Sequence, residues 1–263
     1  LSGGGQRRAQ RDTAVAHSSA QGPARTTNIG LMLRVMGGDD YTWAAALMQR
    51  RRERFAQFSP VFWRPATGVE EAHAEFMRSL AAQDGTVAVR TDHGFAISTP
   101  AGDRCVVDDF AVDHDDLWRT DGAELAFGVW AARSFRQTTL RVVTATADEP
   151  KRTMLRSLGL TVVERWWVKE LDSAGAEVIW GHVMLGSVSG LIVPAPPVYD
   201  PQGPVCLLNG IAAADAAVAA DQAARRGAVL AIVPDTSDRS VVAPIFESAG
   251  FHNPSEFYEG EPR

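Results

Sequence analysis

The sequence predicts a mixed α/β protein in which helices cover both faces of a largely antiparallel sheet. Three observations lead to this class. The apolar period changes from helical to alternating at Asp84-Gly85, strands and helices alternate after residue 104, and the pattern starts again after residue 172. Helices followed by a hairpin and then by alternating strands and helices are typical of such a layered fold.

Two helices are expected first. Residues 40–58 are rich in Ala, Leu, Met, Gln and Arg, which favour helix. Trp43 and Phe55 lie on one face of this helix, with the arginines elsewhere. Residues 59–68 contain two prolines and a glycine and interrupt the chain, and residues 69–82 form the second helix.

A hairpin and a third strand follow. Residues 86–91 and 95–99 alternate apolar and polar side chains around the turn Asp92-His93-Gly94. The remaining elements of the first half are a strand at 104–112, a helix at 121–136, a strand at 140–145, a helix at 149–158 and a strand at 161–171.

The second half repeats the first in reduced form. Residues 105–110 (CVVDDF) resemble 206–211 (CLLNGI), and 154–160 (MLRSLGL) resemble 245–251 (IFESAGF). The second copy is expected to contain strands at 177–185, 188–193, 205–211 and 228–233, a helix at 215–226 and a last helix that ends at ESAGF. The expected organisation is a disordered arm over 1–30, a first domain over 31–171 and a partial domain over 172–263.

Composition narrows the function classes. The net charge is −6, and the first thirty residues are basic, so the remainder is more acidic still. A protein that neutralises many phosphates of nucleic acid is not expected to have this balance. No apolar run of about 18 residues predicts a membrane span. The two cysteines form no zinc motif, no metal is expected, and the cytoplasm is the simplest compartment.

This order of elements resembles the GNAT superfamily of acyl-CoA-dependent N-acetyltransferases, fully over residues 31–171 and partially over 176–257. The resemblance implies a bulged strand, here 106–112, whose backbone meets the pantetheine arm of acetyl-CoA. It also implies a following loop, here 117–123, whose amides wrap the pyrophosphate at a helix N-terminus. The cofactor-binding residues that it implies are Phe110, Ala111, Val112, Leu117, Trp118, Arg119, Thr120, Asp121, Gly122, Ala123 and Asp148.

The loop departs from the family pattern. Arg119 and Gly122 match, whereas Glu124 stands where the family has Gly or Ala. Asp121 would repel a phosphate and is also a good residue to cap the following helix.

A later segment departs as well. Asp148 replaces the family asparagine and Leu155 the family tyrosine, which protonates the departing thiolate. The second copy lacks the loop, so it is expected to bind no CoA and to wall the acceptor cleft.

Asp108 and Asp109 are the candidate catalytic residues, because acylation of an amine needs a base. Adjacent strand residues face opposite sides, so one of the two is expected in the acceptor cleft. Asp109 is preferred because it shares the parity of Val107 and Ala111; a structural aspartate is the alternative. His114 is either another base or a surface histidine.

Aromatic side chains are candidates for the acceptor pocket. Phe62 and Trp63 lie between the first two helices, and Tyr199 lies in the proline-rich turn of the second copy. Ordinary core packing is the alternative for the first two. Cys105 and Cys206 are expected to be core residues rather than nucleophiles.

Two functions remain open. The first is transfer of an acetyl group from acetyl-CoA to the primary amine of a small molecule, by direct attack on the thioester, in a monomer or homodimer with no nucleic-acid or membrane partner. The second is a non-catalytic module that senses acyl-CoA or a small ligand, or mediates protein interaction. They differ in whether the amides of residues 117–122 form an open nest or are covered by side chains.

Overall fold

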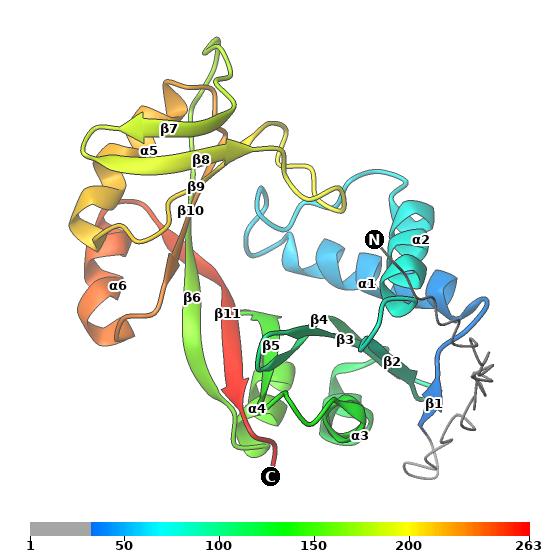
Figure 1. Ribbon diagram of the computed structural model, residues 1–263. Helices are drawn as coiled ribbons and strands as arrows, with labels where there is room; N and C mark the ends of the chain where they lie inside the picture. The colour runs from blue at the N-terminus through cyan, green and yellow to red at the C-terminus, as the bar shows by residue number, and fades with distance from the viewer. Residues whose placement is uncertain (1–32) are drawn as a thin grey trace, which may run out of the picture.

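The computed structural model describes residues 33–263, and the arm expected over 1–30 lies outside this range. The described chain forms one eleven-stranded sheet with helices on both faces (Figure 1). The sheet is mostly antiparallel, with parallel pairing between β4 and β5 and between β9 and β10, which confirms the expected class. The elements are β1 (Arg34–Val35), α1 (Asp40–Phe55), α2 (Glu70–Ala81), β2 (Val87–Arg90), β3 (Gly94–Ala101), β4 (Arg104–Val112), η1 (Asp115–Arg119), α3 (Asp121–Ala132), β5 (Thr139–Ala145), α4 (Glu149–Ser157), β6 (Thr161–Glu170), β7 (Gly181–Leu185), β8 (Val188–Val193), β9 (Val205–Leu207), η2 (Ala213–Asp215), α5 (Ala216–Ala224), β10 (Leu230–Asp235), α6 (Arg239–Ser248) and β11 (His252–Gly260).

The first half is a sheet between two helical layers. Helices α1 and α2 cover one face of β2–β5, and α3 and α4 cover the other (Figure 1). Phe95 belongs to the core under α1 and α2, whereas Leu125 and Leu155 belong to the core under α3 and α4. Helix α3 ends at Ala132, earlier than expected, because Arg133 is extended.

The second half repeats the order of strands and helices in β7–β10 with α5 and α6. Its core includes Trp167 stacked on Phe246, with ring centroids 4.8 Å apart. The strand expected from residue 177 begins only at Gly181, whose φ of +90° does not fit a continuous strand. No helix among residues 33–263 is long and apolar enough to cross a membrane.

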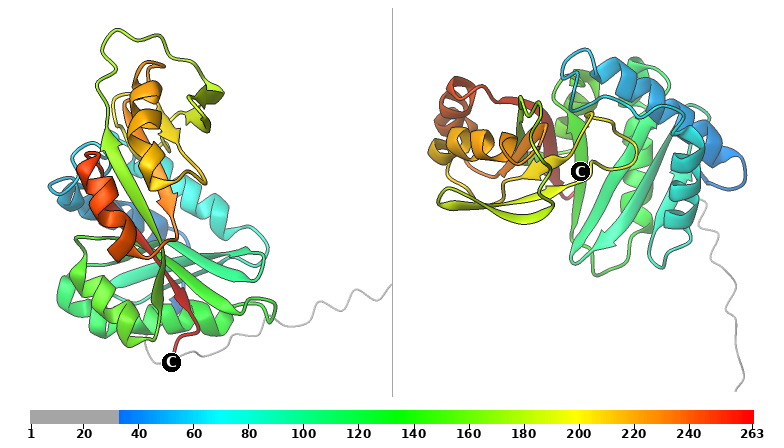
Figure 2. Two further views of the ribbon diagram at one scale, coloured as in Figure 1. Left: turned by 90° about the vertical axis from the view of Figure 1, so that its left-hand side faces the viewer. Right: turned by 90° about the horizontal axis from the view of Figure 1, so that it is seen from above.

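The C-terminal strand β11 was not predicted, and it joins the two halves. The sheet order is β1-β2-β3-β4-β5-β11-β6-β10-β9-β8-β7, so β11 lies between β5 and β6, and β6 lies between β11 and β10. Each half therefore places its last strand against a strand of the other half. Figure 2 shows from two further sides how these long strands hold the halves side by side.

Candidate functional site

A cavity of about 830 Å³ lies between the two halves. The first half contributes α1, α2, β4 and the start of α4, and the second half contributes strands β9 and β10 and the loop 194–201. Most of its wall is apolar. The polar and charged side chains in the wall are Arg51, Arg52, His73, Asp108, Asp109, Thr144, Asp148, Lys151, Tyr199 and Ser255.

A β-bulge places two carboxylates in this cavity. Ala96 pairs with Phe110 and Ser98 pairs with Val107, so Asp108 and Asp109 together face the single residue between Ala96 and Ser98. Both aspartates line the cavity. The expectation that only one would face the cleft is therefore wrong, because it assumed a strand of regular alternation.

The bulge also overturns the parity argument for Asp109. Val107 lies in the core under α3 and α4, whereas Ala111 lies in the core under α1 and α2. The extra residue in the bulge shifts the alternation of side chains by one, so Val107 and Ala111 point to opposite faces of the sheet.

The two aspartates have different partners. Asp109 is buried and accepts a hydrogen bond from His73 Nε2 at 3.1 Å, and Arg52 Nη2 lies 4.0 Å from it. Asp108 has no hydrogen bond or ion pair with any residue that the structure describes. Asp108 retains exposed surface, and it is part of the cavity wall. Burial raises the pKa of Asp108 to about 6, and the neighbouring charge of Asp109 adds to the effect.

The buried side chains of Arg52 and His73 and the half-buried Tyr199 form a group beside Asp109. The Arg52 guanidinium nitrogens lie 3.3 and 3.4 Å from the two ring nitrogens of His73. The same guanidinium lies over the Tyr199 ring, 5.4 Å from its centroid. Burial raises the pKa of Tyr199 to about 12, so its hydroxyl keeps its proton at neutral pH.

Arg52 and His73 are not among the residues predicted for the site, and the arginines of α1 were expected away from the apolar face of the helix. The structure corrects this: Arg51 and Arg52 are buried, and their partners lie on β4, α2 and α4. No local pattern in the sequence links these residues, because they meet only in the folded chain.

The three predicted acceptor residues come together. Phe62, Trp63 and Tyr199 all line the cavity. The Trp63 ring centroid is 4.8 Å from that of Phe62 and 5.8 Å from that of Tyr199. Trp166 extends this wall. Its ring centroid lies 6.2 Å from that of Phe62 and 5.3 Å from that of Phe257. The result is a continuous aromatic surface contributed by both halves.

Backbone pairing between two loops closes this side of the cavity. Pro65 and Tyr199 form an isolated β-bridge. The amide of Ala66 donates to the Val198 carbonyl at 3.1 Å, and the amide of Asp200 donates to the Arg64 carbonyl at 3.0 Å. The loops 60–67 and 194–201, far apart in the sequence, therefore form one wall.

Solved structures with the same arrangement identify the fold. A GCN5-related N-acetyltransferase from Sphaerobacter thermophilus superposes with a TM-score of 0.52 and 11% identity, over 88% of this chain and 95% of that chain. A candidate acetyltransferase from Pyrococcus horikoshii superposes with a TM-score of 0.50 and 12% identity, over 88% of this chain and 89% of that chain. The chain has the GNAT fold. By sequence, no family model matches it and no curated protein matches it.

The loop that the GNAT resemblance assigns to the pyrophosphate is covered by side chains. Residues 115–119 form the 3₁₀ helix η1, and Trp118 is fully buried. Its Cε3 lies 2.5 Å from the position that a Cβ on Gly122 would take. The carboxylate of Asp121 is buried at the same helix start, where it accepts a hydrogen bond from Thr120 Oγ1 at 3.0 Å. At this helix start Gly122 packs against an indole and Asp121 places a carboxylate, whereas Arg119 and Thr120 are exposed.

The backbone of β4 that was expected to meet the pantetheine arm already accepts a hydrogen bond from a side chain. Pairing between β4 and β5 ends at Val107 and Val142. Beyond that point Lys151 Nζ donates to the Phe110 carbonyl at 3.3 Å and to the Val143 carbonyl at 2.9 Å.

Asp148 is occupied as well. This residue is buried in an ion pair with Arg51 and caps α4. The residues present therefore do not fit acyl-CoA at the expected place, and no chemical step is assigned to it here. Of the other implied cofactor residues, Ala111 and Val112 are buried in the core, Leu117 and Ala123 are half-buried, and Arg119 is exposed.

The remaining candidates stay outside the cavity wall. His114 is exposed, and Cys105 and Cys206 are buried free thiols whose pKa values are raised by burial. Asp113 and Asp115, in the acidic loop, pair with arginines of α1. No group of His, Cys, Asp or Glu within residues 33–263 could hold a metal ion.

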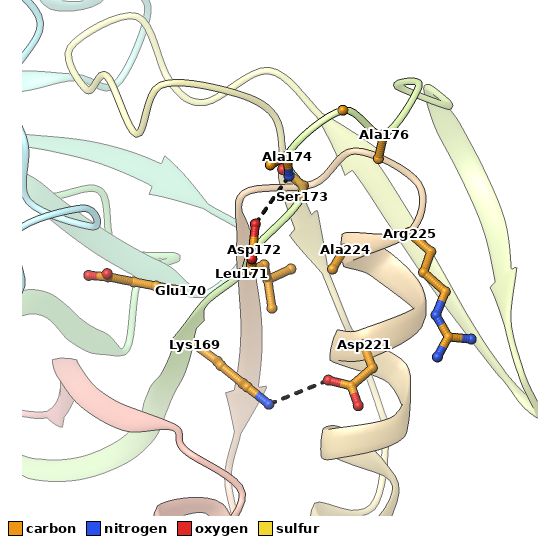
Figure 3. A pocket seen from close by; sticks show the side chains of 11 residues that line it. Lys169, Glu170, Leu171, Asp172, Ser173, Ala174, Ala176, Asp221, Ala224 and Arg225 are labelled. Atoms are coloured by element: carbon orange, nitrogen blue, oxygen red, sulfur yellow. Dashed lines mark hydrogen bonds and ion pairs between the residues drawn. The ribbon is translucent and has the colours of Figure 1, made fainter.

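A second hollow lies where the chain leaves β6 and passes α5 (Figure 3). Lys169 Nζ lies 3.6 Å from Asp221 Oδ1, and the Asp172 side chain accepts from the amide of Ala174 at 3.2 Å. These groups already have partners, and the hollow is open to solvent. The central cavity is therefore the candidate functional site.

Proposed function

We propose that the protein binds a small molecule in the central cavity and does not hold acyl-CoA in the slot that the GNAT resemblance implies. The observation that carries this proposal is the position of Trp118 over Gly122, together with Lys151 between the separating strands β4 and β5. Of the two functions left open by the sequence, this is the non-catalytic one.

The cavity has the size and composition of a ligand site. Its volume of about 830 Å³ falls within the range of about 300–1,000 Å³ typical of small-molecule pockets. Aromatic walls supply most of the surface, and Asp108 supplies a polar group that is free to orient a ligand. Such a site binds a largely apolar molecule with one polar end.

Acetyl transfer to an amine is the second candidate. The fold and the two carboxylates on the β4 bulge favour it, since either carboxylate is placed to take a proton from an acceptor amine. It needs an acyl donor beside β4, however, and Lys151 already uses the carbonyl of Phe110 there.

Two binding measurements separate these functions. Fluorescence of the apolar dye Nile red measures binding in the cavity. Calorimetry with acetyl-CoA measures whether the cofactor binds at the place that the GNAT resemblance implies. The proposal predicts dye binding and no heat of acetyl-CoA binding at millimolar concentration. Micromolar binding of acetyl-CoA, followed by acetylation of an amine, would establish the second candidate instead.

A matched pair of variants locates the dye. Ala72 lies on α2 and lines the cavity, whereas Ala82 caps the same helix and is exposed. Ala72→Trp is expected to weaken dye binding at least tenfold because the indole fills the space, and Ala82→Trp to leave it unchanged. Equal effects of the two substitutions would contradict binding in the cavity.

A further inference from the structure

We propose that the ligand of the cavity is an organic cation with a tertiary or quaternary ammonium centre, held between the Asp108 carboxylate and the aromatic wall. This inference rests on the proposed small-molecule-binding function and names the class of molecule that the site takes.

Asp108 is the unpaired one of the three carboxylates in the cavity wall. Asp109 is engaged by His73 and Arg52, and Asp148 by Arg51. Asp108 has no such partner among residues 33–263 and turns its exposed surface to the cavity. A carboxylate that lines a largely apolar cavity is stabilised further when a cation lies directly beside it.

The cations of the wall are committed elsewhere. Arg51 pairs with Asp148, and Arg52 lies against His73 and Asp109. The ammonium of Lys151 is held by two backbone carbonyls and lies over the rings of Phe110 and Trp118, with 4.8 and 5.3 Å to their centroids. The positive charges of Lys151 and Arg52 act on Asp108 from a distance, but no cationic side chain of residues 33–263 forms an ion pair with it, so a ligand can make the direct contact.

The aromatic wall suits a cation that is also apolar. Tyr199 lies close enough for the charge of Asp108 to act on its hydroxyl, and Trp63 and Phe62 continue the surface from it. The faces of aromatic rings attract cations, and rings arranged as a cage are the usual site for quaternary ammonium groups.

The hydrogen-bond acceptors in the cavity wall favour a ligand whose cationic centre carries few N–H groups. A primary ammonium carries three donors, and each donor that is buried without an acceptor costs free energy. The carbonyls of Phe110 and Val143 already accept from Lys151, so the Asp108 carboxylate is the charged acceptor of the wall that has no partner among residues 33–263. A methylated ammonium has no such requirement and places its methyl groups against the rings.

Three probes, two of one size and a smaller primary ammonium, test this inference by displacement of Nile red. They are benzyltrimethylammonium, its uncharged carbon isostere neopentylbenzene, and benzylammonium. We expect benzyltrimethylammonium to bind at least tenfold more tightly than either of the others. Asp108→Asn is expected to abolish the preference over neopentylbenzene, whereas Asp116→Asn, at an exposed position in η1, is expected to preserve it.

The outcomes distinguish this inference from the function on which it rests. If neither Nile red nor any probe binds, the proposed function fails. If Nile red and neopentylbenzene bind and the trimethylammonium probe binds no better, only the assignment of a cation fails. Tighter binding of benzylammonium than of benzyltrimethylammonium would overturn the class in favour of primary amines.

The pH dependence supplies an independent readout. Protonation of Asp108, with its pKa near 6, removes the counter-charge, and deprotonation of Lys151, whose pKa burial lowers to about 7, removes a competing positive charge. Both changes strengthen cation binding as pH rises from 5 to 8, while binding of neopentylbenzene is expected to stay constant. The titratable and charged groups that face Asp108 are Arg52 of α1, His73 of α2, Asp109 of β4, Lys151 of α4 and Tyr199 of the loop 194–201.

Discussion

The indole of Trp118 lies directly over Gly122, with Cε3 2.5 Å from the position that a Cβ on this glycine would occupy. Trp118 meets Phe110 edge-on at 4.9 Å, and the Arg51 guanidinium and the Lys151 ammonium lie over its rings at 4.9 and 5.3 Å. The start of α3, which the GNAT resemblance reserves for a pyrophosphate, is thus part of a packed core in this chain.

Gly122→Ala is expected to lower the free energy of unfolding by about 1–3 kcal/mol, because the new methyl group overpacks the indole. Better helix propensity offsets part of this loss. Chemical denaturation measures the change. Gly37→Ala is the control, since no atom of residues 33–263 other than those of its chain neighbours lies within 4 Å of the added Cβ, and the free energy of unfolding is expected to change by less than about 0.5 kcal/mol. No loss at Gly122 would show that Trp118 does not occupy this position.

Asp148→Ala is expected to lower the free energy of unfolding by about 3 kcal/mol, because it removes the nearer carboxylate of the buried Arg51 guanidinium and leaves it only Asp115, at 3.7 Å. Glu149 is the next residue and forms an exposed ion pair with Arg156. Glu149→Ala is expected to lower the free energy of unfolding by less than about 1 kcal/mol. Adding Arg51→Met to Asp148→Ala is expected to recover part of the stability. Thermal unfolding of the three variants makes the comparison, and equal losses at Asp148 and Glu149 would contradict the buried pair.

The sequence predicts the fold far better than the site. The resemblance placed the β4 bulge, and Phe62, Trp63 and Tyr199 do line the cavity, because these features follow from local pattern and chain order. Strand β11 was not predicted, because its segment HNPSEFYEG combines Asn, Pro and Gly with few apolar residues. In the structure its register with β6 shifts between His252 and Ser255, beside Pro254.

Long-range contacts account for the other differences. The covering of Gly122 by Trp118 and the closure of the β4–β5 gap by Lys151 both depend on side chains that meet only in the folded protein. A loop motif records spacing, and spacing does not reveal which side chain will cover the amides.

Asp108→Asn is expected to stabilise the protein at pH 7. The pKa of Asp108 in the folded state, about 6, lies above its ordinary value, so the folded state binds more protons and loses stability as pH rises through 6. Removing the charge returns about 1–2 kcal/mol at pH 7, a figure that allows for screening by water in the cavity, and less than about 0.5 kcal/mol at pH 4. Urea denaturation at the two pH values tests this. A loss of stability at pH 7 would mean that the charged form of Asp108 is favoured by a partner.

Tyr199→Ala is expected to loosen the pairing of the two loops that close the cavity. Its ring packs on Trp63 and under Arg52, so removing it leaves the bridge to Pro65 without side-chain support. Hydrogen exchange at the amides of Ala66 and Asp200 is expected to accelerate at least tenfold. Tyr199→Phe keeps the ring and is expected to keep slow exchange, and fast exchange in that variant would assign the closure to the hydroxyl instead.

The fragment 31–171 alone is expected not to fold cooperatively, although its sequence was expected to form a domain. In the intact chain β5 and β6 do not pair with each other, because β11 lies between them and pairs with both. In the fragment β5 keeps β4 as its one neighbour, and β6 loses both β11 and β10. Arg152 loses the carboxylate of the buried Glu256, 3.0 Å from its Nε.

Circular dichroism and amide NMR of the fragment, with and without a co-expressed 172–263 chain, test this expectation. The two chains together are expected to restore a cooperative transition, since β6 and β11 then complete each other's half of the sheet. A folded 31–171 fragment on its own would mean that β6 can move to pair with β5 directly. The cavity would then lack the wall formed by β9, β10 and the loop 194–201, so dye binding by such a fragment would also contradict a ligand site built from both halves.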